Sequence, residues 1–185
     1  MLSRPQRQPE ISVVLAVRDN EETVGHLIRA VAAHLRALAR SFEILVVNDG
    51  SRDNSLSIAR LLSAQVPELR LVTRNSSGRA FLRGAAEAHG DVVVLVEAHR
   101  TVSLAPLGWA LSRLAAGREA VILRGRYIVA RRLLALPIIV RASGPGILFE
   151  AVFERRAEEL GIDVVGSRPQ RTPLLLRPFL RFLAA

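Results

Sequence analysis

The chain has no cysteine and no lysine, and only 4% of its 185 residues are aromatic. The lack of cysteine excludes disulfides and thiolate metal sites. The scarcity of aromatic rings leaves few stacking platforms for bases, so we do not expect a nucleic-acid-binding module. The longest apolar runs, such as residues 133–140, are far shorter than the ~20 residues of a membrane-spanning helix. Residues 1–10 are polar and do not resemble a secretory signal.

All 26 basic residues are arginine, and the net charge is +9. A GC-rich genome would account for the choice of arginine over lysine, but the distribution is more informative. Residues 120–149 carry five arginines and no acid, and residues 168–185 carry four and no acid. Stretches of this kind suit phosphate groups, an anionic membrane or nucleic acid.

Short β-branched runs alternate with amphipathic stretches over the first 126 residues. They predict strands at 11–17, 42–48, 68–73, 91–97 and 119–125, and helices at about 23–40, 55–65, 75–89 and 103–117. We expect Gly90 and Gly117 to end the last two of these helices. The alternation predicts an α/β fold with a doubly wound, mostly parallel sheet flanked by helices.

The pattern loosens beyond residue 126. Residues 128–142 fit a strand, a broken helix or a surface-lying segment, whereas 146–161 predict an amphipathic helix and 162–167 a short strand. The basic, apolar tail at 172–185 fits either contact with an anionic lipid interface or an ordinary packed segment. Because no linker or repeat divides the chain, we expect residues 1–185 to form one domain.

Three acid-bearing turns, at residues 18–21, 49–51 and 97–99, follow predicted strands. The carboxyl ends of parallel strands share one edge of the sheet, where ligands bind in folds of this class. The first turn contains no glycine, which argues against a dinucleotide site of the Gly-x-Gly-x-x-Gly type. Acids that hold a divalent cation, together with arginines, would instead suit a sugar-nucleotide diphosphate.

Three segments in this order, ISVVLAVRDNEETV, FEILVVNDGSRDNS and RNSSGRAFLRGAAEAHGDVVVLVEAH, resemble the nucleotide-binding half of family 2 glycosyltransferases. The nearest type is the polyprenyl-phosphate sugar transferase, as in dolichyl-phosphate mannose synthases. The resemblance implies a GT-A-type fold, with residues 10–126 as the nucleotide-sugar-binding half and 127–185 as a shortened acceptor-side part. It further implies inverting transfer of a hexose from a UDP- or GDP-linked donor to a polyprenyl phosphate or another acceptor.

The resemblance assigns nucleotide-sugar-binding positions in the first motif. Ala16 and Arg18 stand where the family has proline and tyrosine, and Asp19-Asn20, with Glu21 one place later, stands where it has an asparagine–glutamate pair. Asp19 and Glu21 would equally serve as first-turn acids favoured by the helix dipole.

The second and third motifs supply further implied positions. Asp49 matches an aspartate that accepts a hydrogen bond from the nucleobase, and it could also cap the following turn. Gly78 and Arg79 match a glycine and a basic residue that approach the phosphates at a helix N-terminus, although Arg79 could also be one more solvated arginine.

The family's Asp-x-Asp metal motif reads Glu97-Ala98-His99 in this chain. Glutamate and histidine can still coordinate a divalent cation, and histidine suits Mn²⁺ better than Mg²⁺. The opposing interpretation is a decayed site in which both side chains face solvent. Glu150 is a candidate acceptor-side acid or a solvated one.

Two functions from different classes follow. The first is an enzyme that binds a nucleotide-sugar and transfers the sugar to a lipid phosphate or other acceptor. The second is a catalytically silent glycosyltransferase-like module that binds or regulates a partner, which the altered metal motif and short acceptor region would favour. In either case we expect a cytoplasmic protein, with peripheral contact at the inner face of the membrane if the tail meets lipid.

Overall fold

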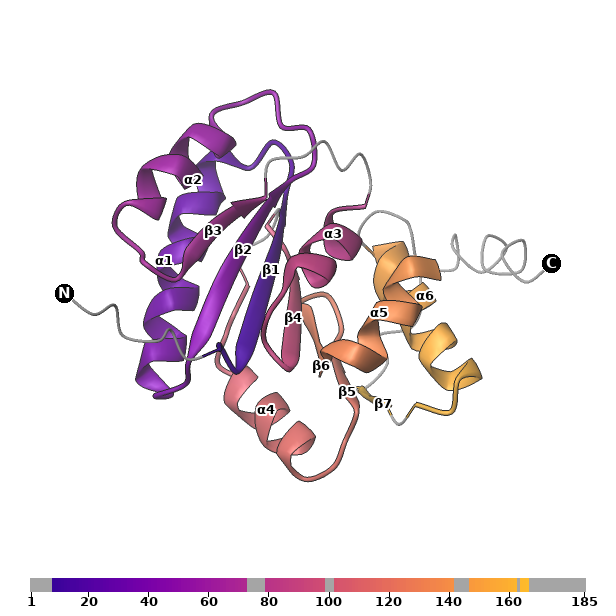
Figure 1. The fold of residues 1–185 in the computed structure, drawn as a ribbon. Coiled ribbons are helices and arrows are strands. Elements are labelled where there is room, and N and C mark those ends of the chain that lie inside the picture. The colour runs from indigo at the N-terminus through magenta and orange to yellow at the C-terminus, as the bar shows by residue number, and fades with distance from the viewer. Residues whose placement is uncertain (1–7, 73–78, 99–101, 142–146, 163, 167–185) are drawn as a thin grey trace.

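A seven-stranded sheet forms the centre of the molecule (Figure 1). The computed structural model describes residues 8–72, 79–98, 102–141, 147–162 and 164–166. The strands are β1 (Ile11–Val17), β2 (Phe42–Asn48), β3 (Leu69–Val72), β4 (Val92–Glu97), β5 (Ala120–Leu123), β6 (Tyr127–Arg131) and β7 (Val164–Gly166). Their order is β3-β2-β1-β4-β6-β5-β7, and β6 runs antiparallel to both of its neighbours while the other pairs are parallel. The predicted mostly parallel sheet is therefore confirmed.

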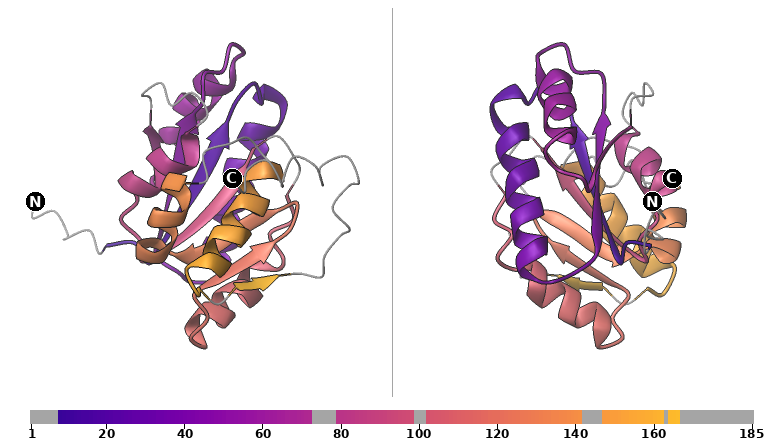
Figure 2. Two further views of the ribbon diagram at one scale, coloured as in Figure 1. Left: turned by 90° about the vertical axis from the view of Figure 1, so that its right-hand side faces the viewer. Right: turned by 60° about the vertical axis from the view of Figure 1, so that its left-hand side comes forward.

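Helices cover both faces of the sheet (Figure 2). One layer consists of α1 (Glu21–Ala37), α2 (Ser55–Ser63) and α4 (Leu107–Ala115). The other consists of α3 (Ala80–Glu87), α5 (Arg132–Arg141) and α6 (Ile147–Glu159). No helix in the described ranges is both long enough and apolar enough to cross a membrane.

The central strands are continuous apolar runs because they are buried from both sides. In β1, Val13 and Leu15 pack into the core below α1 and α4, whereas Val14 packs into the core below α3 and α5. All three side chains are at most 1% exposed. The burial of both faces explains why these strands show no alternation of apolar and polar residues.

Residues 119–131 differ from the prediction. The expected strand at 119–125 is the first half of a hairpin, β5–β6, whose turn at 124–126 places Gly125 at φ +70°. Antiparallel strands need only a short turn between them, so no helix intervenes. Residues 128–142 fitted a strand, a broken helix or a surface-lying segment. In the structure, residues 128–141 form the rest of β6 and then α5.

Of the two glycines predicted to end helices, one does so. Gly117 does follow α4, with φ +93° and its N–H donating to the carbonyl of Leu114. Gly90 does not end a helix, because α3 stops at Glu87. Gly90 instead packs against the start of β1, where an added Cβ would lie 2.8 Å from the Ile11 carbonyl carbon.

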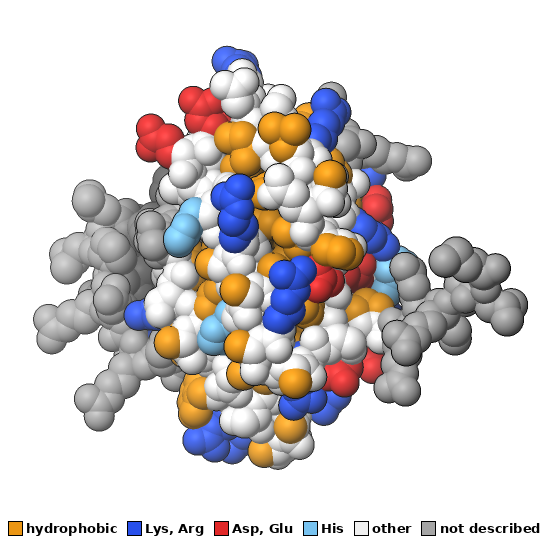
Figure 3. Space-filling view, turned by 90° about the vertical axis from the view of Figure 1, so that its left-hand side faces the viewer, with side chains coloured by type: hydrophobic (Ala, Val, Ile, Leu, Met, Phe, Trp, Pro, Cys, Tyr) orange, Lys and Arg blue, Asp and Glu red, His pale blue; other side chains and the backbone are white. Residues whose placement is uncertain are grey.

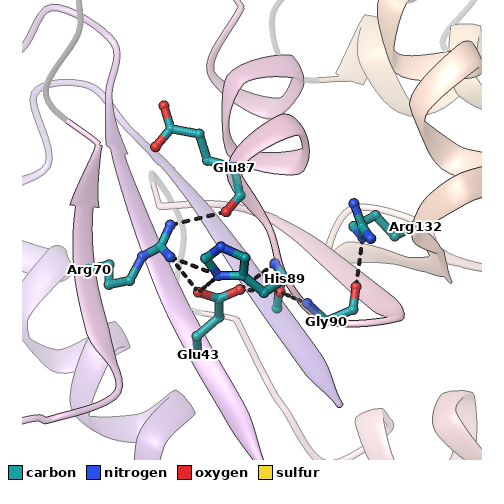
Figure 4. Close-up of polar contacts among 7 residues, drawn as sticks. Glu43, Arg70, Glu87, His89, Gly90 and Arg132 are labelled. Carbon is teal, nitrogen blue, oxygen red and sulfur yellow. Dashed lines mark hydrogen bonds and ion pairs between the residues drawn. The ribbon is translucent and has the colours of Figure 1, made fainter. Parts of the chain in front are cut away.

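A buried carboxylate joins the amino-terminal ends of β1, β2 and β4 (Figure 4). Glu43 Oε1 accepts hydrogen bonds from the Ser12 hydroxyl and the His89 backbone N–H, both at 2.7 Å. Its Oε2 lies 3.3 Å from Arg70 Nη1. Ser12 Oγ in turn accepts the Gly90 N–H at 2.8 Å. No motif of the sequence predicted this network, which joins the strands at the end of the sheet away from the predicted site.

Candidate functional site

The turns that follow β1 and β2 are hydrogen-bonded to each other. The two strands are parallel and in register up to Val17 and Asn48, so the turns emerge side by side. The Asp19 carboxylate accepts the Arg52 backbone N–H at 2.7 Å, and the Asp19 N–H donates to Ser51 Oγ at 3.2 Å. Asp19 has φ +51°, a left-handed conformation that aspartate tolerates better than most residues.

A second set of reciprocal bonds links the starts of α1 and α2. The Glu21 N–H donates to Asp53 Oδ2 at 2.8 Å, and Glu21 Oε2 accepts the Asn54 N–H at 2.9 Å. Burial acts to raise the pKa of Asp53, but hydrogen bonds from Ser55 and from the Glu21 N–H outweigh it, and the pKa is lowered. Asp53 therefore acts as a charged acceptor that holds the two turns together.

These contacts give Asp19 and Glu21 a structural role beyond the predicted ones. Each carboxylate binds the backbone of the neighbouring turn, and Glu21 is also a first-turn acid of α1, as one of the two interpretations expected. Asp53 and Ser55, which complete the link, were not singled out. Their signal was present in the turn sequence DGSRDNS, of which only Asp49 was named as a site residue.

Asp49 and Arg18 lie at the same edge of the sheet. Asp49 directly follows β2, is half-buried, and its backbone N–H donates to the Val17 carbonyl at 2.8 Å. Asn48 Oδ1 accepts the Ser51 N–H at 3.0 Å and so supplies a cap to this turn. Arg18 is exposed just beyond β1.

The end of β4 lies against the end of β1. Glu97 is half-buried and pairs in register with Ala16, and the Ala98 N–H donates to the Ala16 carbonyl at 3.0 Å. The Thr23 hydroxyl of α1 donates to the Ala98 carbonyl at 2.8 Å. Because β2 and β4 lie on opposite sides of β1, the chain changes its direction of winding here. Such a switch point is where open α/β sheets bind ligands.

The predicted metal pair is only partly described. Glu97 provides a carboxylate oxygen, a donor that fits Mn²⁺ or Mg²⁺, whereas His99 and Gly78 lie outside the described residues. Within those described residues, no group of three His, Asp or Glu side chains could hold a metal ion. Arg79 is exposed at the N-cap of α3. The structure thus brings Ala16, Arg18, Asp19, Glu21, Asp49 and Glu97 to the ends of three adjacent strands.

Known proteins are similar to this chain in sequence. Residues 12–137 match the family model described as glycosyl transferase family 2. An undecaprenyl-phosphate 4-deoxy-4-formamido-L-arabinose transferase from Pseudomonas paraeruginosa is 35% identical over 95 residues, which cover 48% of this chain and 27% of that protein. The same transferase from Pseudomonas fluorescens is 32% identical over 92 residues, with 48% and 27% covered. The chain thus matches about a quarter of the length of these relatives.

Solved structures share the fold. The mannosyltransferase PcManGT from Pyrobaculum calidifontis, in complex with GDP-Man and Mn²⁺, has a TM-score of 0.67 at 17% identity, covering 97% of this chain and 66% of that one. Glucosyl-3-phosphoglycerate synthase from Mycobacterium tuberculosis, with Mn²⁺, UDP and phosphoglyceric acid, has a TM-score of 0.63 at 20% identity, covering 92% and 74%. The predicted GT-A-type fold is confirmed.

Proposed function

Because the chain belongs to glycosyl transferase family 2, we propose that it binds a nucleotide-sugar at the carboxyl ends of β1, β2 and β4. The observation that carries the proposal is the pairing of Glu97 with Ala16 at the switch point, beside the linked turns that hold Asp19 and Asp49. The complex of PcManGT with GDP-Man and Mn²⁺ supports a donor of this class for a protein of this fold.

Four of the predicted residues have a proposed task in binding the donor. Asp49, half-buried at the end of β2, would accept an N–H of the base. Arg79, at the start of α3, would approach the phosphates together with helix N–H groups. Glu97 and His99 would hold Mn²⁺ or Mg²⁺, and the cation would neutralise charge on the diphosphate as it departs.

The proposed acceptor is a polyprenyl phosphate, which the names of the undecaprenyl-phosphate transferases among the relatives support. A phosphate oxygen of the acceptor would bond to the anomeric carbon as the bond from that carbon to the nucleoside diphosphate breaks. The diphosphate leaves with the electron pair, and the configuration inverts. A phosphate is already anionic, so this step needs no general base from the protein.

Helix α5 supports contact with a membrane that carries such an acceptor. Leu133 and Val140 are 74% and 55% exposed, and seven residues, or two turns, place them on one face. Arginines begin and end this helix, and it contains no acid. By contrast, the side of α1 and α2 shows charges of both signs among its apolar side chains (Figure 3). The tail that also suggested membrane contact, residues 172–185, lies outside the described residues.

Calorimetry with UDP-glucose and GDP-mannose tests the proposal. One of the two donors is expected to bind in the presence of Mn²⁺, and chelation by EDTA or the substitution Glu97→Gln should weaken that binding. Glu22→Gln, which removes an exposed acid of α1, is the matched control and should bind as the wild type does. Failure of the wild type to bind either donor with Mn²⁺ present refutes the proposal. Binding without transfer or hydrolysis would favour the silent module.

A further inference from the structure

The turn between β5 and β6 is held by one face of α6. Glu150 Oε2 accepts the Gly125 backbone N–H at 2.9 Å, and Glu154 accepts a hydrogen bond from the Arg124 guanidinium. Glu150 and Glu154 are four residues apart, so both project from the same side of the helix. The turn is thus bound through its backbone and through a side chain.

The adjoining apolar face of α6 fixes the helix in place. Phe149, Phe153 and Ala157 are at most 3% exposed and pack into the core beneath α3 and α5. The ring of Phe149 lies 4.6 Å from the ring of Phe81 in α3, centroid to centroid. Because the helix is anchored by its apolar face, its acids form a firm support for the turn.

Charges on α6 neutralise one of the two arginines in the turn. The hydrogen bond to Glu154 raises the pKa of Arg124 against the opposing effect of burial, and the charges of Glu150 and Glu158 act in the same direction. The side chains of Arg124 and Glu154 are 28% and 25% exposed, so the pair is largely shielded from water. Arg126, two residues on, is exposed.

The register of the sheet places Arg126 beside the candidate site. Strands β4 and β6 are antiparallel, with Val96 opposite Tyr127. Arg126 directly precedes Tyr127, and Glu97 directly follows Val96, so both residues adjoin this end of the strand pair. The turn therefore adjoins the strand end at which the diphosphate is proposed to bind. Helix α6 lies outside the part of the chain that matches the family model, residues 12–137.

Building on the proposed function, we infer that Glu150 and Glu154 are positioning residues for phosphate binding. By holding Arg124 and the Gly125 N–H, they fix the turn and so keep Arg126 next to the end of β4, from where its guanidinium would reach the diphosphate. They act through the turn and do not touch the substrate. The two acids thereby make α6 part of the site, although none of its residues belongs to a nucleotide-binding motif.

The test measures the affinity of the full chain for UDP-glucose and GDP-mannose with Mn²⁺. The double variant Glu150→Gln/Glu154→Gln should bind the preferred donor about tenfold more weakly, as expected when a contact between charged groups is lost. Glu159→Gln is the matched control, because Glu159 lies on the same helix and pairs with Arg155 and Arg156 of that helix. It should bind as the wild type does.

A double-mutant cycle with Arg126→Ala separates positioning from general destabilisation. If the acids act through Arg126, the double variant should change the affinity less than about twofold in the Arg126→Ala background. A tenfold loss in that background as well would overturn the inference, and so would unchanged affinity of the double variant beside a wild type that binds. A wild type that binds neither donor refutes the proposed function itself, and the inference fails with it. Where the double variant does not fold, each single variant is put through the same cycle.

Discussion

Replacing Glu43 with alanine is expected to lower the free energy of unfolding by about 2–6 kcal/mol, because two donors lose their buried acceptor. The Glu43 side chain is only 8% exposed and receives hydrogen bonds from the Ser12 hydroxyl and the His89 N–H. Alanine leaves both donors without this acceptor, and each buried donor left unsatisfied costs about 1–3 kcal/mol. Arg70 adds little to the cost because its side chain is 39% exposed and can be hydrated.

Urea unfolding followed by circular dichroism gives the measurement, with Glu68→Ala as the control. Glu68 pairs with Arg36 through two hydrogen bonds, at 2.6 and 3.0 Å, but the two side chains are 25% and 49% exposed. A surface pair of this kind contributes under about 1 kcal/mol. Equal losses for the two variants, at equal urea m-values, would refute the argument that burial of Glu43 sets the cost. Glu43→Gln should fall between them, since its amide oxygen can still accept one set of bonds.

Two further predictions concern packing and pH. An added Cβ on Gly84 of α3 would lie 2.2 Å from a methyl carbon of Val14, so Gly84→Ala should destabilise the protein by about 1–3 kcal/mol. An added Cβ on Gly108 of α4 would have its nearest contact at 3.7 Å, so Gly108→Ala should be neutral or stabilising by up to about 1 kcal/mol. Thermal unfolding measures both changes. The lowered pKa of Asp53 means that its contribution to stability is fully present above its ordinary value of 3.8 and is lost as the pH falls through the lowered one. The difference in stability between wild type and Asp53→Asn should therefore be larger at pH 7 than at pH 3, and a difference that grows on acidification would contradict this assignment.

The strands that carry the site were predictable because burial on both faces requires continuous runs of apolar residues. The predicted bounds of β1 and β2 match the structure, and β4 begins only one residue later than expected. The hairpin β5–β6 was not predicted, because its two strands are also continuous apolar runs. An apolar run does not show its direction, and two short antiparallel strands look like one strand followed by an undefined segment.

Candidate site residues were predictable as positions but not as contacts. Following the carboxyl ends of parallel strands was enough to bring Asp19, Asp49 and Glu97 to one edge. That Asp19 binds the backbone of Arg52 could not be foreseen, because the bond depends on the register of β1 against β2. Whether Asp49 and Glu97 bind a nucleotide-sugar and a metal remains a prediction for the experiments above.

The sequence by itself determined the α/β class, the three motifs and the family, because these depend on local patterns of apolar residues and on short segments that follow them. The tertiary structure decided which turns hold each other, how α6 supports the β5–β6 turn, and which side of α5 faces solvent. The residues joined in these contacts are separated by 25 residues, as in Gly125 and Glu150, or by more than 30, as in Glu21 and Asp53. Contacts over such separations follow from the order and direction of strands in the sheet, which no local stretch of sequence specifies.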